Sequence, residues 1–131
     1  MTLGGLSTQC PCGTGADYDS CCGPLHRGER QATTAVELMR SRYTAYARGE
    51  LGHLFRSWHP HTRPADVSPD PATTWTGLEV LATSLGGPAD DEGTVEFRAS
   101  FRTPSGAGSL HELSRFARRA GRWVYVDGDV R

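Results

Sequence analysis

Three amino acids are missing from the sequence: lysine, isoleucine and asparagine. All 14 basic side chains other than histidine are therefore arginine. The codons of the missing residues are rich in A and T, so their absence indicates a GC-rich genome and favours a bacterial source. This absence reflects coding bias and does not bear on the chemistry of the chain.

The sequence also lacks a long hydrophobic segment. No stretch approaches the roughly 20 apolar residues that a membrane-spanning helix needs. The opening MTLGGLSTQ has neither the basic region nor the apolar core of a secretory signal peptide. We therefore expect a soluble cytoplasmic protein without a membrane partner, and thiols in that compartment stay reduced.

An excess of charge of one sign is missing as well. The formal net charge is −1, which gives no general attraction to nucleic acid or to an anionic membrane. Nucleic acid is therefore not expected as a partner. The charges are segregated, because residues 65–96 include acids but no arginine, whereas seven arginines outnumber three acids from Arg98 onward. An antiparallel sheet would bring these segments together, so we expect their charges to neutralise each other.

Cysteine is confined to one short stretch of the 131 residues. CPCGTGADYDSCCG contains all four cysteines, Cys10, Cys12, Cys21 and Cys22. Metal binding, disulfides and free thiols are the alternatives. A chain of this length buries roughly two-thirds of its unfolded surface and does not need disulfides to fold. Adjacent cysteines are also awkward to pair, because their side chains diverge in most backbone conformations. Four thiolates that converge on one point would bind a metal such as zinc, and the spacing favours this reading.

The cysteine stretch resembles the SEC-C motif, the zinc-binding tail of the bacterial preprotein translocase ATPase, which also occurs in many small bacterial proteins. That motif reads C-x-C-G-S-G-x-x-[YF]-x-x-C-[CH]-G. The resemblance implies zinc as a cofactor, held by the four cysteines. Such a site is structural, because four sulfur ligands leave no open position for water or substrate. The lysines usual around the motif's tyrosine are Ala16, Asp17 and Asp19 here, so the translocase's chaperone and ribosome partners are not carried over. We expect the neighbouring His26 to be a solvated loop histidine.

Two helices are predicted after the cysteines. Thr34 and Glu37 have the spacing of a capping box, apolar residues then recur at helical spacing, and Gly49 is placed to end the helix, which we predict over 35–48. A shorter helix is predicted over 51–57 and is stopped by the prolines that follow. Four of its apolar residues are expected to be buried: Leu51, Leu54, Phe55 and Trp58.

Four strands are predicted in the remainder, in TWTGLEVLATSLGG, GTVEFRASFRT, SLHELSRFARR and RWVYVDG. Alternation in the first strand puts Leu78, Val80 and Ala82 on one face, and in the third it puts Glu112 on the face of Phe116. A knuckle, then helices, then antiparallel strands is an α+β layout, with helices packed on one face of a curved sheet.

This order, together with MRSRYTAYARGEL, SWHPHTRP and ELSRFARRAGRWVYVDG, resembles the YchJ family of uncharacterised bacterial proteins. The resemblance implies an N-terminal SEC-C motif, here over 1–30, and a nuclear transport factor 2-like (cystatin-like) domain over 31–131. That fold encloses a cone between its long helix and its sheet. Because the domain has its own apolar faces, we expect it to survive loss of the knuckle.

The cone is the predicted place for a pocket. Arg42 lies beside the apolar stripe of the long helix, and Glu112 would face it from the third strand as a candidate partner. A mostly polar pocket is expected near these two residues and His59. The residues predicted to line it come from the long helix, the WHPHTRP stretch and the strands: Arg42, Tyr43, His59, Arg63, Trp75, Glu112 and Trp123.

Two function classes remain open. The first is a non-enzymatic, zinc-containing binding or adaptor protein, with the knuckle as a protein-contact surface and the cone as a ligand or partner pocket. The alternative is a small enzyme that uses the cone for acid/base chemistry on a small molecule, with His59 and Glu112 as a conceivable pair. The sequence has no nucleophile elbow, phosphate loop or paired-carboxylate motif, which favours the binding protein.

Overall fold

The computed structural model describes residues 8–131. Residues 1–7, part of the predicted knuckle, lie outside the described range. A single turn of 3-10 helix, η1 (Tyr18–Ser20), leads into the helices α1 (Cys22–His26), α2 (Ala35–Arg48) and α3 (Leu51–Arg56). Four strands follow: β1 (Thr74–Leu85), β2 (Glu92–Thr103), β3 (Gly106–Arg119) and β4 (Arg122–Val130).

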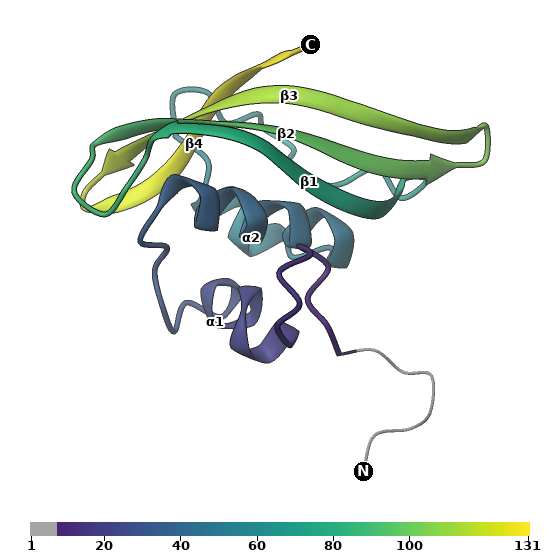
Figure 1. Cartoon of the computed structure of the whole chain (residues 1–131), viewed down its shortest axis with the longest axis horizontal. Helices are drawn as coiled ribbons and strands as arrows, with labels where there is room; N and C mark the ends of the chain where they lie inside the picture. The colour runs from purple at the N-terminus through teal and green to yellow at the C-terminus, as the bar shows by residue number, and fades with distance from the viewer. Residues whose placement is uncertain (1–7) are drawn as a thin grey trace.

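The strands form one antiparallel sheet in the order β1-β2-β3-β4. The sheet is curved, α2 runs across its concave face, and α1 lies on the far side of α2 (Figure 1). The α+β class with helices on one face of an antiparallel sheet is confirmed. No helix among residues 8–131 is long and apolar enough to cross a membrane.

Helix α2 has the predicted bounds because its two ends are capped as the sequence indicates. The Glu37 backbone N–H donates to the Thr34 hydroxyl over 3.1 Å, and the Thr33 N–H donates to the Glu37 carboxylate over 2.8 Å. At the other end, Gly49 adopts the left-handed conformation with φ 78° and its N–H donates to the Ala45 carbonyl. Glycine adopts this conformation without the steric penalty of a side chain.

Helix α3 buries less than the sequence predicts. Leu54 is fully buried, but Leu51 and Phe55 are 44% and 48% exposed, so the prediction is wrong for these two residues. The helix has only six residues, and one narrow face of it meets the protein. The guanidinium group of Arg63 lies 3.6 Å from the centre of the Phe55 ring and covers part of its outer face.

The faces of the sheet follow the predicted alternation, with one exception. Cross-strand partners such as Phe97 and Glu112 share the face that packs on α2. In β1, however, the register shifts between Val80 and Ala82. A bulge of this kind moves the residues after it to the opposite face, so Ala82 is exposed and does not share the face of Val80.

Two clusters of buried residues make up the core. One joins α2 to the sheet and comprises Ala35, Leu38, Met39, Val95, Phe116 and Trp123. The other joins the cysteine stretch to the domain and comprises Cys10, Cys12, Cys22, Tyr43 and Ala99. The cysteines therefore pack against the same helix and sheet that enclose the cone. The predicted boundary between residues 30 and 31 crosses this second cluster and stays a prediction.

The acidic and basic segments neutralise each other only in part. Glu79 of β1 pairs with Arg98 of β2 at 3.2 Å, and Glu96 contacts His111 at 2.6 Å. Arg115 instead pairs with Asp127 and Asp129 of its own basic segment. Within residues 8–131, Arg119 and Arg122 beside the β3–β4 turn form no ion pair with a carboxylate.

Candidate functional site

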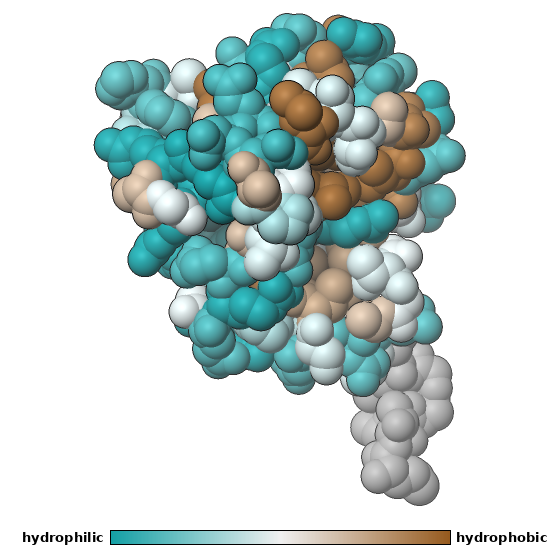
Figure 2. All heavy atoms as spheres, turned by 60° about the vertical axis from the view of Figure 1, so that its left-hand side comes forward, coloured by the Kyte–Doolittle hydropathy of each residue, from teal (hydrophilic) through white to brown (hydrophobic). Residues whose placement is uncertain are grey.

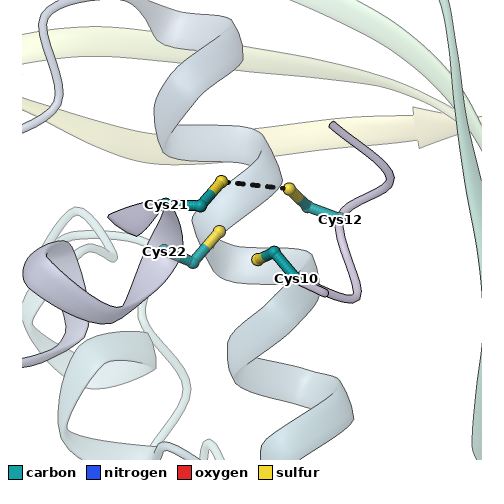
Figure 3. A group of neighbouring side chains, drawn as sticks. All are labelled: Cys10, Cys12, Cys21 and Cys22. Carbon is teal, nitrogen blue, oxygen red and sulfur yellow. Dashed lines mark hydrogen bonds between the residues drawn. The ribbon is translucent and has the colours of Figure 1, made fainter. Parts of the chain in front are cut away.

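The four cysteines converge on one point although they come from two segments. Cys10 and Cys12 lie in the loop that begins the described chain, whereas Cys21 and Cys22 lie where η1 meets α1. Figure 3 shows their side chains pointing toward one another in front of α2. All four are free thiols, and all four sulfur atoms lie within 4.8 Å of one another. The cluster is buried except for Cys21, which is partly exposed.

Local backbone turns produce this convergence. The Gly13 N–H donates to the Cys10 carbonyl over 3.2 Å, and the Cys21 N–H donates to the Tyr18 carbonyl over 3.0 Å. Gly13 and Gly15 have φ values of 85° and 86°, a region that residues with a side chain rarely adopt. The two glycines therefore let the loop reverse and bring its thiols toward Cys21.

The spacing of the sulfur atoms suits a tetrahedral ion. Ligands at ~2.3 Å from a tetrahedral centre lie roughly 3.8 Å apart. The Sγ atoms of Cys12 and Cys21 are 3.6 Å apart, and the largest separation in the cluster is within 4.8 Å. These four residues could hold a metal ion with only small side-chain movements.

The cluster also favours a thiolate. Hydrogen bonding from the neighbouring thiols, that of Cys22 above all, lowers the pKa of Cys12 to about 4. The same contact and burial raise the pKa of Cys22. The Thr14 hydroxyl lies 3.2 Å from the Cys21 sulfur and 3.6 Å from that of Cys12. A thiolate is the form that binds metal, so the donors have the chemistry that a metal site needs.

His26 does not belong to the cysteine cluster, and it is not a solvated loop residue either. It is only 7% exposed, and both ring nitrogens make hydrogen bonds. Nε2 donates to the Ser41 carbonyl over 2.8 Å, because a carbonyl can only accept, and Nδ1 therefore accepts from the Tyr18 hydroxyl at 2.7 Å. Burial lowers the pKa of His26. The prediction of a solvated side chain is wrong, because His26 ties α1 to α2.

A second buried histidine extends this contact to α3. The His53 ring lies 4.7 Å from the His26 ring, and its Nε2 is 2.8 Å from the Ser41 hydroxyl. That hydroxyl donates to the Leu38 carbonyl over 2.7 Å, so it accepts from His53. Burial lowers the pKa of His53 to about 3. Neutral histidines thus join the three helices below the sheet.

A cavity of about 300 Å³ lies between α2 and the concave face of the sheet. Residues of α2, of all four strands and of the segment after α3 line it. They are Met39, Arg42, Tyr43, Tyr46, Trp58, Trp75, Phe97, Ala99, Leu110, Glu112, Ser114, Phe116 and Tyr125. The predicted cone is therefore a real hollow, but most of its wall is aromatic or aliphatic rather than polar.

Arg42 brings a buried positive charge to the cavity. It is 5% exposed, and its Nη1 donates to the Leu54 carbonyl over 3.2 Å and to the Ser57 hydroxyl over 2.7 Å. Its guanidinium carbon lies 4.7 Å from the ring centres of both Trp58 and Tyr125. Burial lowers the pKa of Arg42 to about 10, so the group stays charged at neutral pH.

Glu112 faces the same cavity with its own donors. Its carboxylate accepts from the Ser114 hydroxyl over 2.6 Å and from the Tyr125 hydroxyl over 3.3 Å. The opposite strand makes room for it with Gly128, where a Cβ atom would collide with the carboxylate. Among residues 8–131, Glu112 forms no ion pair with Arg42. Arg42 and Glu112 therefore share one cavity, and they interact through the attraction of their charges and not through a direct contact.

Four of the seven predicted pocket residues line this cavity, namely Arg42, Tyr43, Trp75 and Glu112. His59 does not, because its backbone N–H donates to the Tyr125 carbonyl and its ring faces His61. Arg63 and Trp123 line a different cleft, on the other side of Trp58. The conceivable pair of His59 and Glu112 is therefore not assembled in this cavity.

Sequence reasoning missed several of the residues that give the cavity its character. Tyr46 lies one helical turn after Arg42, and Ser114 alternates with Glu112, so both positions follow from periodicity alone. Trp58 and Tyr125 come from segments that meet only in the fold, where the Tyr125 N–H donates to the Ser57 carbonyl. No local pattern indicates that these two rings enclose Arg42.

Comparisons with known proteins agree with this architecture. A family model described as "YchJ, middle NTF2-like domain" matches residues 34–128. A UPF0225 protein of Streptomyces coelicolor is 52% identical over 120 residues, which covers 92% of this chain and 94% of the relative. A UPF0225 protein of Geobacter sulfurreducens is 46% identical over 129 residues, with 94% and 80% covered.

Two solved structures are similar over nearly the whole chain. The solution structure of a SEC-C motif containing protein from Rhodopseudomonas palustris has a TM-score of 0.80 and 36% identity, and covers 92% of this chain and 96% of that one. The crystal structure of a SEC-C motif containing protein from Psychrobacter arcticus has a TM-score of 0.73 and 30% identity, with 93% and 82% covered.

The fold and the cysteine cluster together define a class: a nuclear transport factor 2-like domain preceded by a SEC-C-type knuckle. Within that class, the match over residues 34–128 and the identity to the UPF0225 relatives are specific. The chain belongs to the YchJ family.

Proposed function

We propose that this chain is a non-enzymatic, zinc-containing binding protein whose cone holds a small molecule. The observation that carries the proposal is the cavity itself. A volume of about 300 Å³ lies at the lower end of the range of small-molecule sites. An apolar wall with few convergent polar groups is also typical of such sites.

Zinc is the metal that we propose for Cys10, Cys12, Cys21 and Cys22. Four cysteine ligands at tetrahedral spacing are typical of structural zinc sites, and bound zinc would supply folding energy to a segment too short for a core of its own. The loop 13–17 beside the ligands is exposed. We propose this loop as the protein-contact surface of the knuckle.

The polar groups of the cavity indicate the chemistry of its ligand. Arg42 Nη1 donates to the Leu54 carbonyl and the Ser57 hydroxyl, and the Tyr46 side chain is a further hydrogen-bond partner of the guanidinium group. The other N–H groups of Arg42 can bind an acceptor. The indole N–H of Trp58 is buried and has no hydrogen-bond partner among the described residues. A buried donor without a partner is destabilising, which makes the Trp58 side of the wall a weak point of the packing. The proposed ligand is an aromatic or aliphatic molecule with one anionic group.

The alternative of acid/base catalysis has less support. His59, one member of the conceivable acid/base pair, is outside the cavity, and the lining includes neither histidine nor cysteine. Burial and the nearby Glu112 charge raise the pKa of Tyr125, so its phenol holds its proton at neutral pH. Groups that exchange protons near pH 7 suit general acid/base chemistry, and this wall has none among its tyrosines.

The test uses 8-anilinonaphthalene-1-sulfonate, an anionic aromatic dye that fluoresces in apolar surroundings. The zinc-loaded protein is expected to bind one dye per chain. Arg42→Met should weaken binding about tenfold, since it removes a charged hydrogen bond. Glu112→Gln should strengthen binding, because it removes the like charge. Arg98→Met on the outer face is the matched control and should change nothing.

Opposite effects of the two cavity variants separate a specific site from partial unfolding, which would increase dye binding in both. The proposal fails if many dyes bind per chain, or if Arg98→Met has the same effect as Arg42→Met. It also fails if Glu112→Gln leaves the affinity unchanged.

A further inference from the structure

A second hollow of about 350 Å³ lies outside the cone, where the knuckle, α3 and the β3–β4 turn meet. Its walls include Leu25 and Gly28 from the knuckle side, Arg56 and Arg63 from α3 and the segment after it, and the residues around the β3–β4 turn. Trp58 lines both hollows, so it forms part of the wall between them. We call this second hollow the junction cleft.

The junction cleft is strongly basic. Five arginines line it, and no aspartate or glutamate does. They are Arg30, Arg56, Arg63, Arg119 and Arg122. Arg30 is neutralised by Glu37 at 2.6 Å. Among residues 8–131, none of the other four forms an ion pair with a carboxylate. Four positive charges in one cleft contrast with a net charge of −1 for the whole chain.

The β3–β4 turn places two of these arginines directly opposite each other. Arg119 and Arg122 are direct cross-strand partners, joined by Ala120 and Gly121 with φ values of 53° and 78°. Like charges at directly opposite positions destabilise a sheet. Both side chains are exposed. This pair costs folding energy that an anion between the two guanidinium groups would recover.

The other two arginines are held from the opposite wall. Arg56 Nη2 donates to the His26 carbonyl over 3.0 Å, and Arg63 Nη1 donates to the Phe55 carbonyl over 3.3 Å. A backbone carbonyl orients a guanidinium group without cancelling its charge. A planar guanidinium group can donate two parallel hydrogen bonds to the oxygens of one phosphate. An anion in the cleft can therefore be bound by arginines from both walls.

The geometry points to the junction cleft as a binding site for a small molecule that bears two or more linked phosphate groups. A multiply charged ligand matches four unneutralised arginines, and the cleft volume suits a small molecule. A nucleic-acid backbone fits less well. Figure 2 turns the end of the molecule where β3 meets β4 toward the viewer, and the surface there is mostly hydrophilic, with an apolar patch at the upper right. The chain as a whole has a formal net charge of −1, which gives no general attraction to a long polyanion.

The test is isothermal titration of the full, zinc-loaded chain with inorganic pyrophosphate. One pyrophosphate should bind per chain, at least tenfold more tightly than inorganic phosphate. Arg119→Ser and Arg122→Ser should each weaken binding about tenfold. Arg102→Ser removes the same charge from an exposed position in β2 outside the cleft, and should leave the affinity within twofold.

Thermal melts give a second readout that does not depend on the binding assay. Without pyrophosphate, the double variant Arg119→Ser/Arg122→Ser should melt at or above the temperature of the parent, because the like-charge pair is gone. With pyrophosphate, the parent should gain melting temperature and the double variant should not. The zinc content is measured after each titration, so that metal loss to pyrophosphate is detected.

Three outcomes would overturn the inference. These are no saturable pyrophosphate binding, equal weakening by Arg102→Ser, and tighter binding of a single-stranded 12-mer oligonucleotide than of pyrophosphate. The last would assign the cleft to nucleic acid. Because the probe and variants differ from those of the cone, failure here leaves the proposed ligand site in the cone unaffected.

Discussion

The buried His53 makes a quantitative prediction about stability and pH. In the fold its pKa is lowered to about 3, chiefly by burial and further by the neighbouring His26, Arg42 and Arg56. In the unfolded chain it is close to 6.5. The unfolded chain therefore binds a proton that the folded protein does not, at every pH between these two values. The stabilisation is complete above pH 6.5 and is lost as the pH falls toward 3.

The size of the effect follows from the two pKa values. Each pH unit in this window is worth about 1.4 kcal/mol for one proton. Between roughly pH 7.5 and pH 5, His53 should lower the free energy of unfolding by about 2 kcal/mol. His26 should add to this loss, because its pKa is lowered too. Carboxylates contribute little here, since they titrate at lower pH.

The assay is urea denaturation at both pH values for the parent chain and for His53→Gln. The side-chain amide of glutamine can donate to the Ser41 hydroxyl in place of His53 Nε2, but it does not titrate. The variant should lose about 2 kcal/mol less than the parent over this pH range. Metal loss affects both proteins alike and cancels in the difference. Equal losses in the two proteins, or a His53 pKa near 6.5 by NMR titration, would refute the reasoning.

Two further predictions concern the cysteines and the cone. Elemental analysis should find about one zinc per chain in the parent and much less in Cys12→Ser. The melting temperature of Cys12→Ser should be about 5 °C or more below that of the parent, because the cysteines share a core with Tyr43 and Ala99. An unchanged melt after metal loss would show that knuckle and domain are independent units. Arg42→Met should cost about 2–3 kcal/mol and Glu112→Gln under about 1 kcal/mol. In urea melts the two effects should add to within about 1 kcal/mol, and a larger coupling would reveal an ion pair.

The elements that the sequence predicted well depend on neighbouring residues. The cap at Thr34, the stop at Gly49 and the alternation from Phe97 through Phe116 are set by backbone sterics and local hydrogen bonds. The cysteine spacing likewise predicted a cluster, since the turns that close it lie within thirteen residues. In each case the interacting groups are close in the chain, so the local sequence pattern is enough to predict the local structure.

The sequence predicted the cone less completely, because its wall comes from α2, all four strands and the segment after α3. Arg42 and Glu112 do face the same cavity, as helical and strand periodicity indicated. Their partners are Ser57 and the rings of Trp58 and Tyr125 in one case, and Ser114 and Tyr125 in the other. Which of several candidate partners satisfies a buried charge is settled by packing, and no spacing rule contains that information.

The sequence by itself determined the α+β order, the bounds of α2, the cluster of four thiols and the family resemblance. Only the tertiary structure decided that His26 is buried, that His59 lies outside the cone, and that five arginines gather at the junction cleft. These facts depend on contacts between residues as far apart as Arg56 and Arg122. Burial and local charge arise from the sum of all such contacts, so they become defined only when the chain has folded.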